Sequence, residues 1–146
     1  MKVTIDIVSE GENEIIIKCQ QLDEEIEALL QLIEESVNKL IVNREGEMIF
    51  LQPNEIFFVE AVDNKIFVYT EDAVCQSQES LYNLETMYSH MGLVRIGKSQ
   101  LVNLHHIKKL KSIMNSRIEI TLESGDRLVV SRHYARAFKS RLGLEH

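Results

Sequence analysis

Short apolar runs bounded by turn-forming residues fill the chain from residue 39 to residue 130. Strands are predicted at residues 39–42, 48–51, 56–61, 65–70, 93–96, 101–104, 117–123 and 127–130, with a further candidate at 74–78. Turn residues such as Asp63-Asn64 and Gly125-Asp126 separate neighbouring runs. Strands this short, joined by such tight turns, pair in the antiparallel sense. The sequence therefore predicts a mainly β domain, α+β overall, built from antiparallel sheets.

Helical periodicity replaces this pattern in three places. Apolar residues three or four positions apart predict a helix over roughly residues 22–38, with acids in its first turn. A short amphipathic helix is predicted over residues 81–91, with Ser77 or Ser80 as its cap, and Ser131 is predicted to cap a final helix. Two more strands, at residues 3–8 and 14–19, complete the expectation of a small ββα unit over residues 1–40, followed by a β domain over 41–142.

The charge is divided unevenly along the chain, although its formal total is only -7. Residues 1–90 hold five Lys/Arg and 19 Asp/Glu, a net of -14, whereas residues 91–146 hold 11 and four, a net of +7. This asymmetry favours a basic face for an anionic partner, joined to an acidic, solvated body. The alternative is chance clustering of charge on solvated surfaces.

Composition narrows the class of protein further. With 45% hydrophobic and 27% charged residues, the sequence is typical of a globular domain and excludes disordered, collagen-like and disulfide-stapled chains. No apolar run approaches the ~20 residues that cross a bilayer, and the start lacks a signal-peptide core, so we expect a cytoplasmic protein without membrane insertion. Cys19 and Cys75 are expected to be reduced thiols. The ending Leu144-Glu145-His146 resembles an expression-tag scar, and residues 143–146 are left out of the predicted domain.

A phosphate-loop pattern, G-x-x-x-x-G-K-[ST], occurs at Gly92–Ser99. Its middle residues favour a strand, and the residues after Ser99 do not predict the helix that such a loop requires. His105 and His106 are adjacent, so on a strand they would point to opposite faces and could not chelate one ion together. We therefore expect no enzyme, no cofactor and no metal site, and a nucleotide-binding loop is a remote alternative.

Three ordered blocks resemble a known family. Residues 53–61 (PNEIFFVEA) resemble the opening signature of LytTR-type DNA-binding domains, residues 93–107 (LVRIGKSQLVNLHHI) the central one, and residues 122–134 (LESGDRLVVSRHY) the closing one. The resemblance covers about residues 40–142 and leaves the N-terminal unit outside. It implies a bacterial transcriptional regulator without a receiver domain, whose elongated β fold reads successive major grooves of double-stranded DNA through loops.

The resemblance also implies which residues contact DNA. It places Asn64 and Lys65 at one base-contact region, Lys98 at a second and Arg132 at a third. Arg can donate two hydrogen bonds to guanine, and Lys is a looser donor. The predicted contacts to the DNA backbone are Ser99, Lys108, Lys109, Ser131 and Arg136. Lys111, Lys139 and Arg141 are expected to be solvated, and Arg95 and Asn103 either contact DNA or tie loop backbone in place.

Partners follow from the same resemblance. Repeated promoter sites imply two copies on DNA, and therefore a homodimer at least in the complex. Members of the family that lack a receiver domain are often encoded with small membrane proteins that restrain them, which makes such a regulator a further expected partner. The acidic helix of residues 1–40 is then a protein-interaction or dimerisation element. The alternative is that it covers an edge or face of its own β domain.

Overall fold

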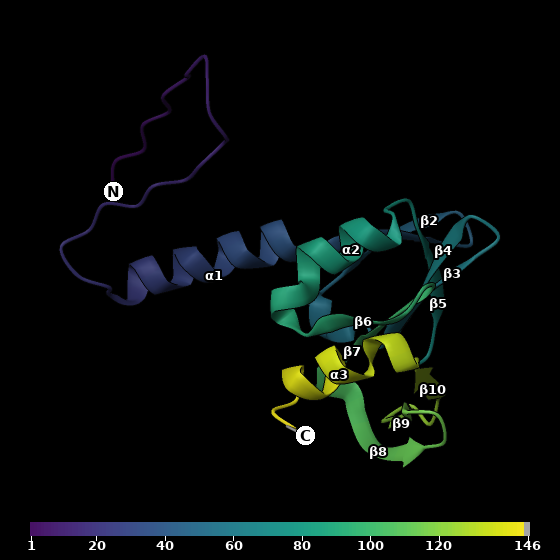
Figure 1. Ribbon diagram of the computed structural model, residues 1–146. Helices are drawn as coiled ribbons and strands as arrows, with labels where there is room; N and C mark the ends of the chain where they lie inside the picture. The colour runs from purple at the N-terminus through teal and green to yellow at the C-terminus, as the bar shows by residue number, and fades with distance from the viewer. Residues whose placement is uncertain (145–146) are drawn as a thin grey trace. The chain divides into compact units, whose positions relative to one another are not determined.

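The computed structural model describes residues 1–144, although not the side chains of residues 34–38 (Figure 1). Glu145 and His146, on which the tag-scar interpretation partly rests, lie outside the described residues. The chain divides into two compact units, Met1–Glu34 and Glu35–His146.

The first unit contains no strand among its described residues. The two strands expected at residues 3–8 and 14–19 are not formed, and Ile5 and Ile7 are 84% and 92% exposed. A two-stranded hairpin is stable only when its apolar face packs against something else, and strand-type composition alone does not supply that surface. The expected helix does form, as α1 (Glu24–Asn38), and the Asp23 carboxylate accepts a hydrogen bond from the Ile26 N–H at 3.0 Å. The predicted ββα unit therefore retains its helix and lacks its strands.

The second unit is mainly β, which confirms the predicted fold class. Its strands are β1 Leu40–Arg44, β2 Glu47–Leu51, β3 Phe58–Val62, β4 Lys65–Tyr69, β5 Val74–Ser77, β6 Leu93–Gly97, β7 Gln100–Asn103, β8 Ile107–Ile113, β9 Arg117–Leu122 and β10 Arg127–Val130. Seven form a sheet in the order β2-β1-β5-β4-β3-β7-β6, and three form a second sheet in the order β10-β9-β8. The pairs in both sheets are antiparallel.

Two helices pack on these sheets through their own buried apolar residues. They are α2 (Leu81–Tyr88) and α3 (Arg132–Arg141), and short 3-10 turns occupy Pro53–Glu55, Ser89–Met91 and Leu104–His106. Ser80 caps α2 through its hydroxyl, which accepts from the Asn83 N–H at 3.0 Å. Ser131 begins α3 as expected, but its hydroxyl makes no capping bond.

Two hydrophobic cores hold the second unit together. One lies between α2 and the seven-stranded sheet and includes Leu40, Val59 and Leu84. The other joins both sheets to α3 and includes Val102, Ile120 and Phe138. In Figure 1, α3 lies against β6, and the sheet of β8, β9 and β10 is on its other side. Because the second core contains residues from both sheets and from α3, these three parts pack against one another.

Candidate nucleic-acid interface

The first predicted base-contact region is the tight turn between β3 and β4. Val62 pairs with Lys65, and the two residues between them, Asp63 and Asn64, have φ angles of 50° and 64°. Two consecutive residues with positive φ are the signature of a type I′ turn, which Asp and Asn tolerate better than most residues. Asn64 and Lys65 are both exposed at this turn.

The second region is the turn between β6 and β7, where Lys98 and Ser99 are exposed. The Ala61 N–H donates to the Ser99 carbonyl at 2.8 Å, which ties this turn to the end of β3. Arg95 holds the turn from the other side: its Nη1 donates to the Lys98 carbonyl at 2.8 Å and its Nε to Glu85 Oε1 at 3.2 Å. Arg95 thus has the structural role that was one of its two expected roles.

The third region is the start of α3. The Ser131 N–H donates to the Ile96 carbonyl at 2.8 Å, so α3 begins beside the end of β6, next to the Lys98 turn. Arg132 and Arg136 are exposed and lie one helical turn apart. A hollow of about 520 Å³ here is lined by Ser116, Arg132, Ala135, Arg136, Lys139, Ser140 and Leu144.

The structure therefore brings all four predicted base-contact residues to one end of the second unit. Asn64 and Lys65 are joined to Lys98 through the Ala61–Ser99 hydrogen bond, and Arg132 is joined to it through the Ser131–Ile96 hydrogen bond. Asp63 is the exposed carboxylate of the same turn as Asn64. We call the turns at Asp63-Asn64 and Lys98-Ser99, together with the start of α3, the reading end.

Two predicted backbone contacts lie elsewhere. Lys108 and Lys109 begin β8, where Lys109 pairs with Thr121 of β9, whereas Ile113 at the other end of β8 pairs with Arg117. Because β10 runs from Arg127, opposite Thr121, to Val130, opposite Ile118, Ser131 lies at the Ile113 end of this sheet. The two lysines are therefore at the end of the sheet away from Arg132, and their contact with DNA stays a prediction.

Ser116 lies close to the predicted DNA contacts of α3, and the sequence analysis did not single it out. It lies in the turn between β8 and β9 and lines the hollow that contains Arg132 and Arg136. Its φ of 58° follows a φ of 65° at Asn115, which is the conformation of a tight hairpin turn. The Asn115-Ser116 pair between an apolar run and Arg117 was the available signal, and it was missed because β8 was not predicted.

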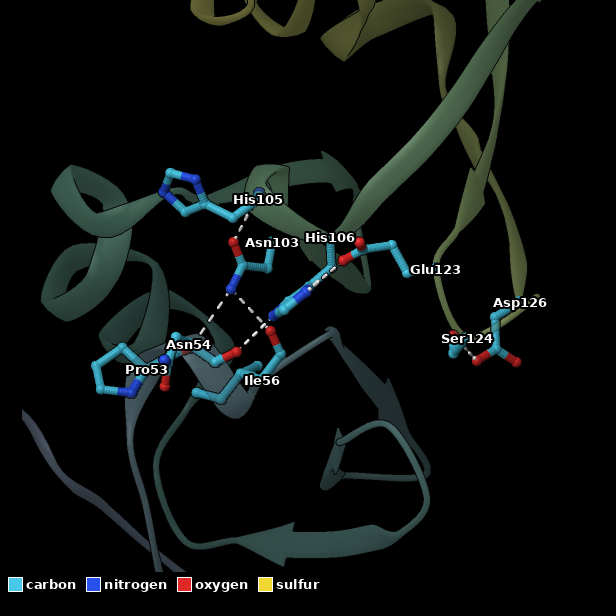
Figure 2. Close-up of polar contacts among 9 residues, drawn as sticks. All are labelled: Pro53, Asn54, Ile56, Asn103, His105, His106, Glu123, Ser124 and Asp126. Carbon is cyan, nitrogen blue, oxygen red and sulfur yellow. Dashed lines mark hydrogen bonds and ion pairs between the residues drawn. The ribbon is translucent and has the colours of Figure 1, made fainter.

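A buried polar framework supports the opposite end of β3 and β7 (Figure 2). Asn103 is 2% exposed; its amide donates to the Ile56 carbonyl at 2.8 Å and the Pro53 carbonyl at 3.3 Å, and its oxygen accepts from the His105 N–H at 3.0 Å. This settles Asn103 as a structural residue. Next to it, Gly92 has a φ of 105°, and a Cβ atom there would lie 2.8 Å from the His105 ring, so this position requires glycine.

Gly92–Ser99 forms β6 and the turn to β7, and no helix follows it, so the phosphate-loop alternative lacks its structure. Within residues 1–144 no three His, Cys, Asp or Glu side chains are grouped as a metal site would require.

Burial raises the pKa of the Cys75 thiol, and burial with the nearby Glu60 and Asp126 carboxylates raises the pKa of the Tyr69 hydroxyl, so both groups stay neutral. Among the described helices, none has the length and apolar character to span a bilayer.

Comparison with known proteins now decides the family. Residues 46–143 match the LytTr DNA-binding domain, which is two thirds of the chain. The chain belongs to the LytTR DNA-binding domain family. The matched range contains every predicted base-contact residue and the whole reading end, and it leaves the first unit outside.

Similar proteins agree with this assignment. The sensory transduction protein LytT of Bacillus cereus is 26% identical over 106 residues, which cover 73% of this chain and 43% of LytT. An uncharacterized response regulatory protein of Vibrio cholerae is 29% identical over 112 residues, 77% of this chain and 46% of that protein. A solved LytTr DNA-binding domain from Bacillus cereus superposes with a TM-score of 0.69 at 25% identity, covering 73% of this chain and 97% of that domain. This chain thus spans less than half the length of these two curated relatives.

Proposed function

We propose that this chain is a sequence-specific transcriptional regulator that reads double-stranded DNA with its reading end. The observation that carries the proposal is the convergence of Asn64, Lys65, Lys98 and Arg132 on one end of a LytTR domain, each exposed and each at a tight turn or a helix start. Hydrogen bonds from such side chains to base edges carry sequence information, and cations nearby bind phosphates. Ser99, Ser131 and Arg136 are at the same end, where they suit contacts to the DNA backbone.

The family resemblance implies contact with more than one groove. Hydrogen bonds link the hairpin that carries Lys98 both to the end of β3, just before the Asn64 turn, and to the start of α3, so the three predicted contact regions are neighbours that can face one duplex. Each chain then reads one half-site, and two copies occupy repeated sites spaced about one or two helical turns apart. Arg132 is the residue best suited to guanine, because its guanidinium can bond O6 and N7 together.

Selection of bound sequences from a random DNA pool, followed by fluorescence anisotropy on the enriched site, tests this proposal. We expect one enriched half-site, in repeats, and an affinity that falls steeply as salt rises, because phosphate contacts release counterions. Arg132→Ala is expected to weaken binding to that site by about 1–3 kcal/mol, and by more than Lys139→Ala does.

Arg127→Ala is the matched control for this series, since Arg127 is an exposed arginine at the start of β10, at the end of its sheet away from Arg132. It should bind the enriched site as the wild-type chain does. A pool with no enriched sequence, or an affinity that does not change with salt, would contradict the proposal.

A second role belongs to the first unit. It holds nine Asp/Glu and two Lys, and therefore the whole formal charge of -7, since residues 35–146 hold 14 of each sign. Its exposed aliphatic side chains, Val3, Ile5, Ile7, Ile15 and Ile16, are between 69% and 92% exposed. Exposed apolar side chains on a separate, acidic unit favour a surface for another protein. We propose that this unit joins two copies or binds a regulator, for which a small membrane protein is the candidate that the family resemblance suggests.

A further inference from the structure

His106 makes polar contacts through both nitrogens of its ring (Figure 2). It ends the 3-10 turn between β7 and β8. Nδ1 lies 2.9 Å from Glu123 Oε1, and Nε2 contacts the Asn54 carbonyl oxygen. The imidazole also stacks on the Phe57 ring, with centroids 3.9 Å apart and planes 4° apart. Polar contacts therefore hold the imidazole at both ring nitrogens, and stacking on Phe57 holds one face of the ring.

These contacts join the two sheets at the end remote from the reading end. Asn54 belongs to the turn that leads into β3, and β3 ends at the Asn64 turn. Glu123 follows β9, and its N–H donates to the His106 carbonyl at 2.9 Å; the chain then runs through β10 to Arg132. One ring therefore connects the strands that carry the first and third base-contact regions.

The two acceptors determine which protonation state of the His106 ring can hydrogen-bond to both. A carboxylate oxygen and a backbone carbonyl oxygen are acceptors, so each needs an N–H from the imidazole. Neutral imidazole has one N–H and one lone pair, whereas imidazolium has two N–H groups. When the ring is neutral, one of its nitrogens faces an oxygen with no proton between them, and that contact is lost.

The charged groups around the ring come from four elements. Glu123 comes from the turn after β9 and Glu55 from the turn before β3, and the cleft of about 560 Å³ that includes His106 is also lined by Arg44 of β1 and by Glu71 and Asp72 of the β4–β5 turn, with the Cys75 thiol beside them. The carboxylates outnumber the single guanidinium in this cleft. Glu123 is the group among them that contacts the ring directly.

We propose that His106 is a positioning residue whose protonation holds the two sheets in the arrangement that presents Asn64 and Arg132 to DNA together. The proposal rests on the proposed function, because it assigns a pH-dependent regulation to the same reading end. His is the side chain that ordinarily changes charge between about pH 5 and 8. The bridge is complete at the acidic end of that window and is lost as the pH rises through it, so DNA affinity should fall in the same direction.

The first arm of the test needs no DNA. Nitrogen-15 NMR of the histidine rings in the full chain reports whether each nitrogen carries a proton. At the acidic end of the range we expect both His106 nitrogens to be protonated, because the two acceptor oxygens need both N–H groups. A His106 ring that is neutral there overturns the proposal, whatever the chain does with DNA.

The second arm measures affinity for the selected site between pH 6 and 8 by anisotropy. The wild-type chain should lose roughly tenfold in affinity across this range, the worth of a hydrogen bond to a charged group, and His106→Gln should bind with a flat profile near the alkaline wild-type value. Glu123→Gln keeps the ring and removes its carboxylate partner, so it should flatten the profile even if His106→Gln folds poorly. His90→Gln is the control, because His90 is an exposed histidine outside both the bridge and the reading end.

The outcomes separate the two proposals. Specific binding whose pH profile is the same in the wild-type chain and in both bridge variants overturns the positioning role and leaves the proposed function standing. Absence of sequence-specific binding at every pH overturns the proposed function, and the NMR arm still decides the protonation of His106. A His90→Gln profile as flat as that of His106→Gln would also overturn the assignment to His106.

Discussion

At the scale of single residues, the position of a polar side chain is determined by the backbone groups to which it must hydrogen-bond. Asn103 is the clearest case, because one buried amide serves two carbonyls and one N–H. Sequence alone left Asn103 and Arg95 each with two roles, since an Asn or Arg in a signature block is equally compatible with DNA contact and with loop support. Burial of Asn103, and the bond from Arg95 to the Lys98 carbonyl, are properties of the folded chain that no local pattern contains.

Removal of the Asn103 amide should be costly to the fold. Asn103→Ala leaves the Ile56 carbonyl and the His105 N–H without their Asn103 partner and removes one of the two hydrogen bonds to the Pro53 carbonyl, at a predicted cost of about 2–4 kcal/mol in the free energy of unfolding. Urea denaturation followed by circular dichroism measures it. Asn83→Ala, at an exposed position of α2, is the control and should cost under about 0.5 kcal/mol. A loss at Asn103 as small as the control's would contradict the framework role.

At the scale of elements, the sequence predicted most of the second unit. The strands that become β1 to β7, β9 and β10, the helix α2 and the start of α3 were all expected, because alternation, turn residues and caps agree there. β8 was missed since Lys108, Lys109 and Lys111 interrupt its apolar pattern, and it is an edge strand whose outward side chains face solvent. The strands expected at residues 3–8 and 14–19 failed for the opposite reason: their composition is right, but their apolar side chains stay exposed, Ile5 and Ile7 at 84% and 92%.

The β6–β7 hairpin offers a test of how an element presents Lys98, a predicted base-contact residue. Arg95→Lys keeps the charge, but the compact ammonium lacks the planar fork with which the guanidinium reaches Glu85 from Nε and the Lys98 carbonyl from Nη1. The Lys98 turn should therefore loosen, with a loss of roughly three- to tenfold in affinity for the selected site and little change in stability. Anisotropy and urea denaturation measure the two effects.

Arg44→Lys, the same substitution on β1, should change neither quantity. If Arg95→Lys binds the selected site as tightly as the wild-type chain, the Arg95 contacts do not position the turn. If it loses several kcal/mol of stability instead, Arg95 supports the fold as a whole and has no particular role at the reading end.

At the scale of the whole molecule, charge and structure divide the chain at different places. The split at residue 90 suggested a basic reading half, yet Asn64 and Lys65 lie before it, and the charge of the second unit sums to zero. What makes the reading end cationic is the fold, which gathers Lys65 of β4, Lys98 of the β6–β7 turn and Arg132 of α3 from segments distant in sequence. The compact units divide after Glu34, so Leu40, a buried residue of the first core, belongs with the β domain. The sequence had predicted a division after residue 40, which assigned Leu40 to the N-terminal unit.

Removal of residues 1–34 tests the role of the acidic unit. The remainder keeps both hydrophobic cores, so we expect it to fold and to bind the selected site. Without the net charge of -7, its association with DNA should be several-fold faster at low salt, and the advantage should vanish as salt screens it. Stopped-flow anisotropy at several ionic strengths measures the rates, and sedimentation measures the oligomeric state. A soluble remainder that binds DNA but has lost self-association or regulator binding would support the interaction role, whereas an aggregating remainder would favour a structural role for the first unit.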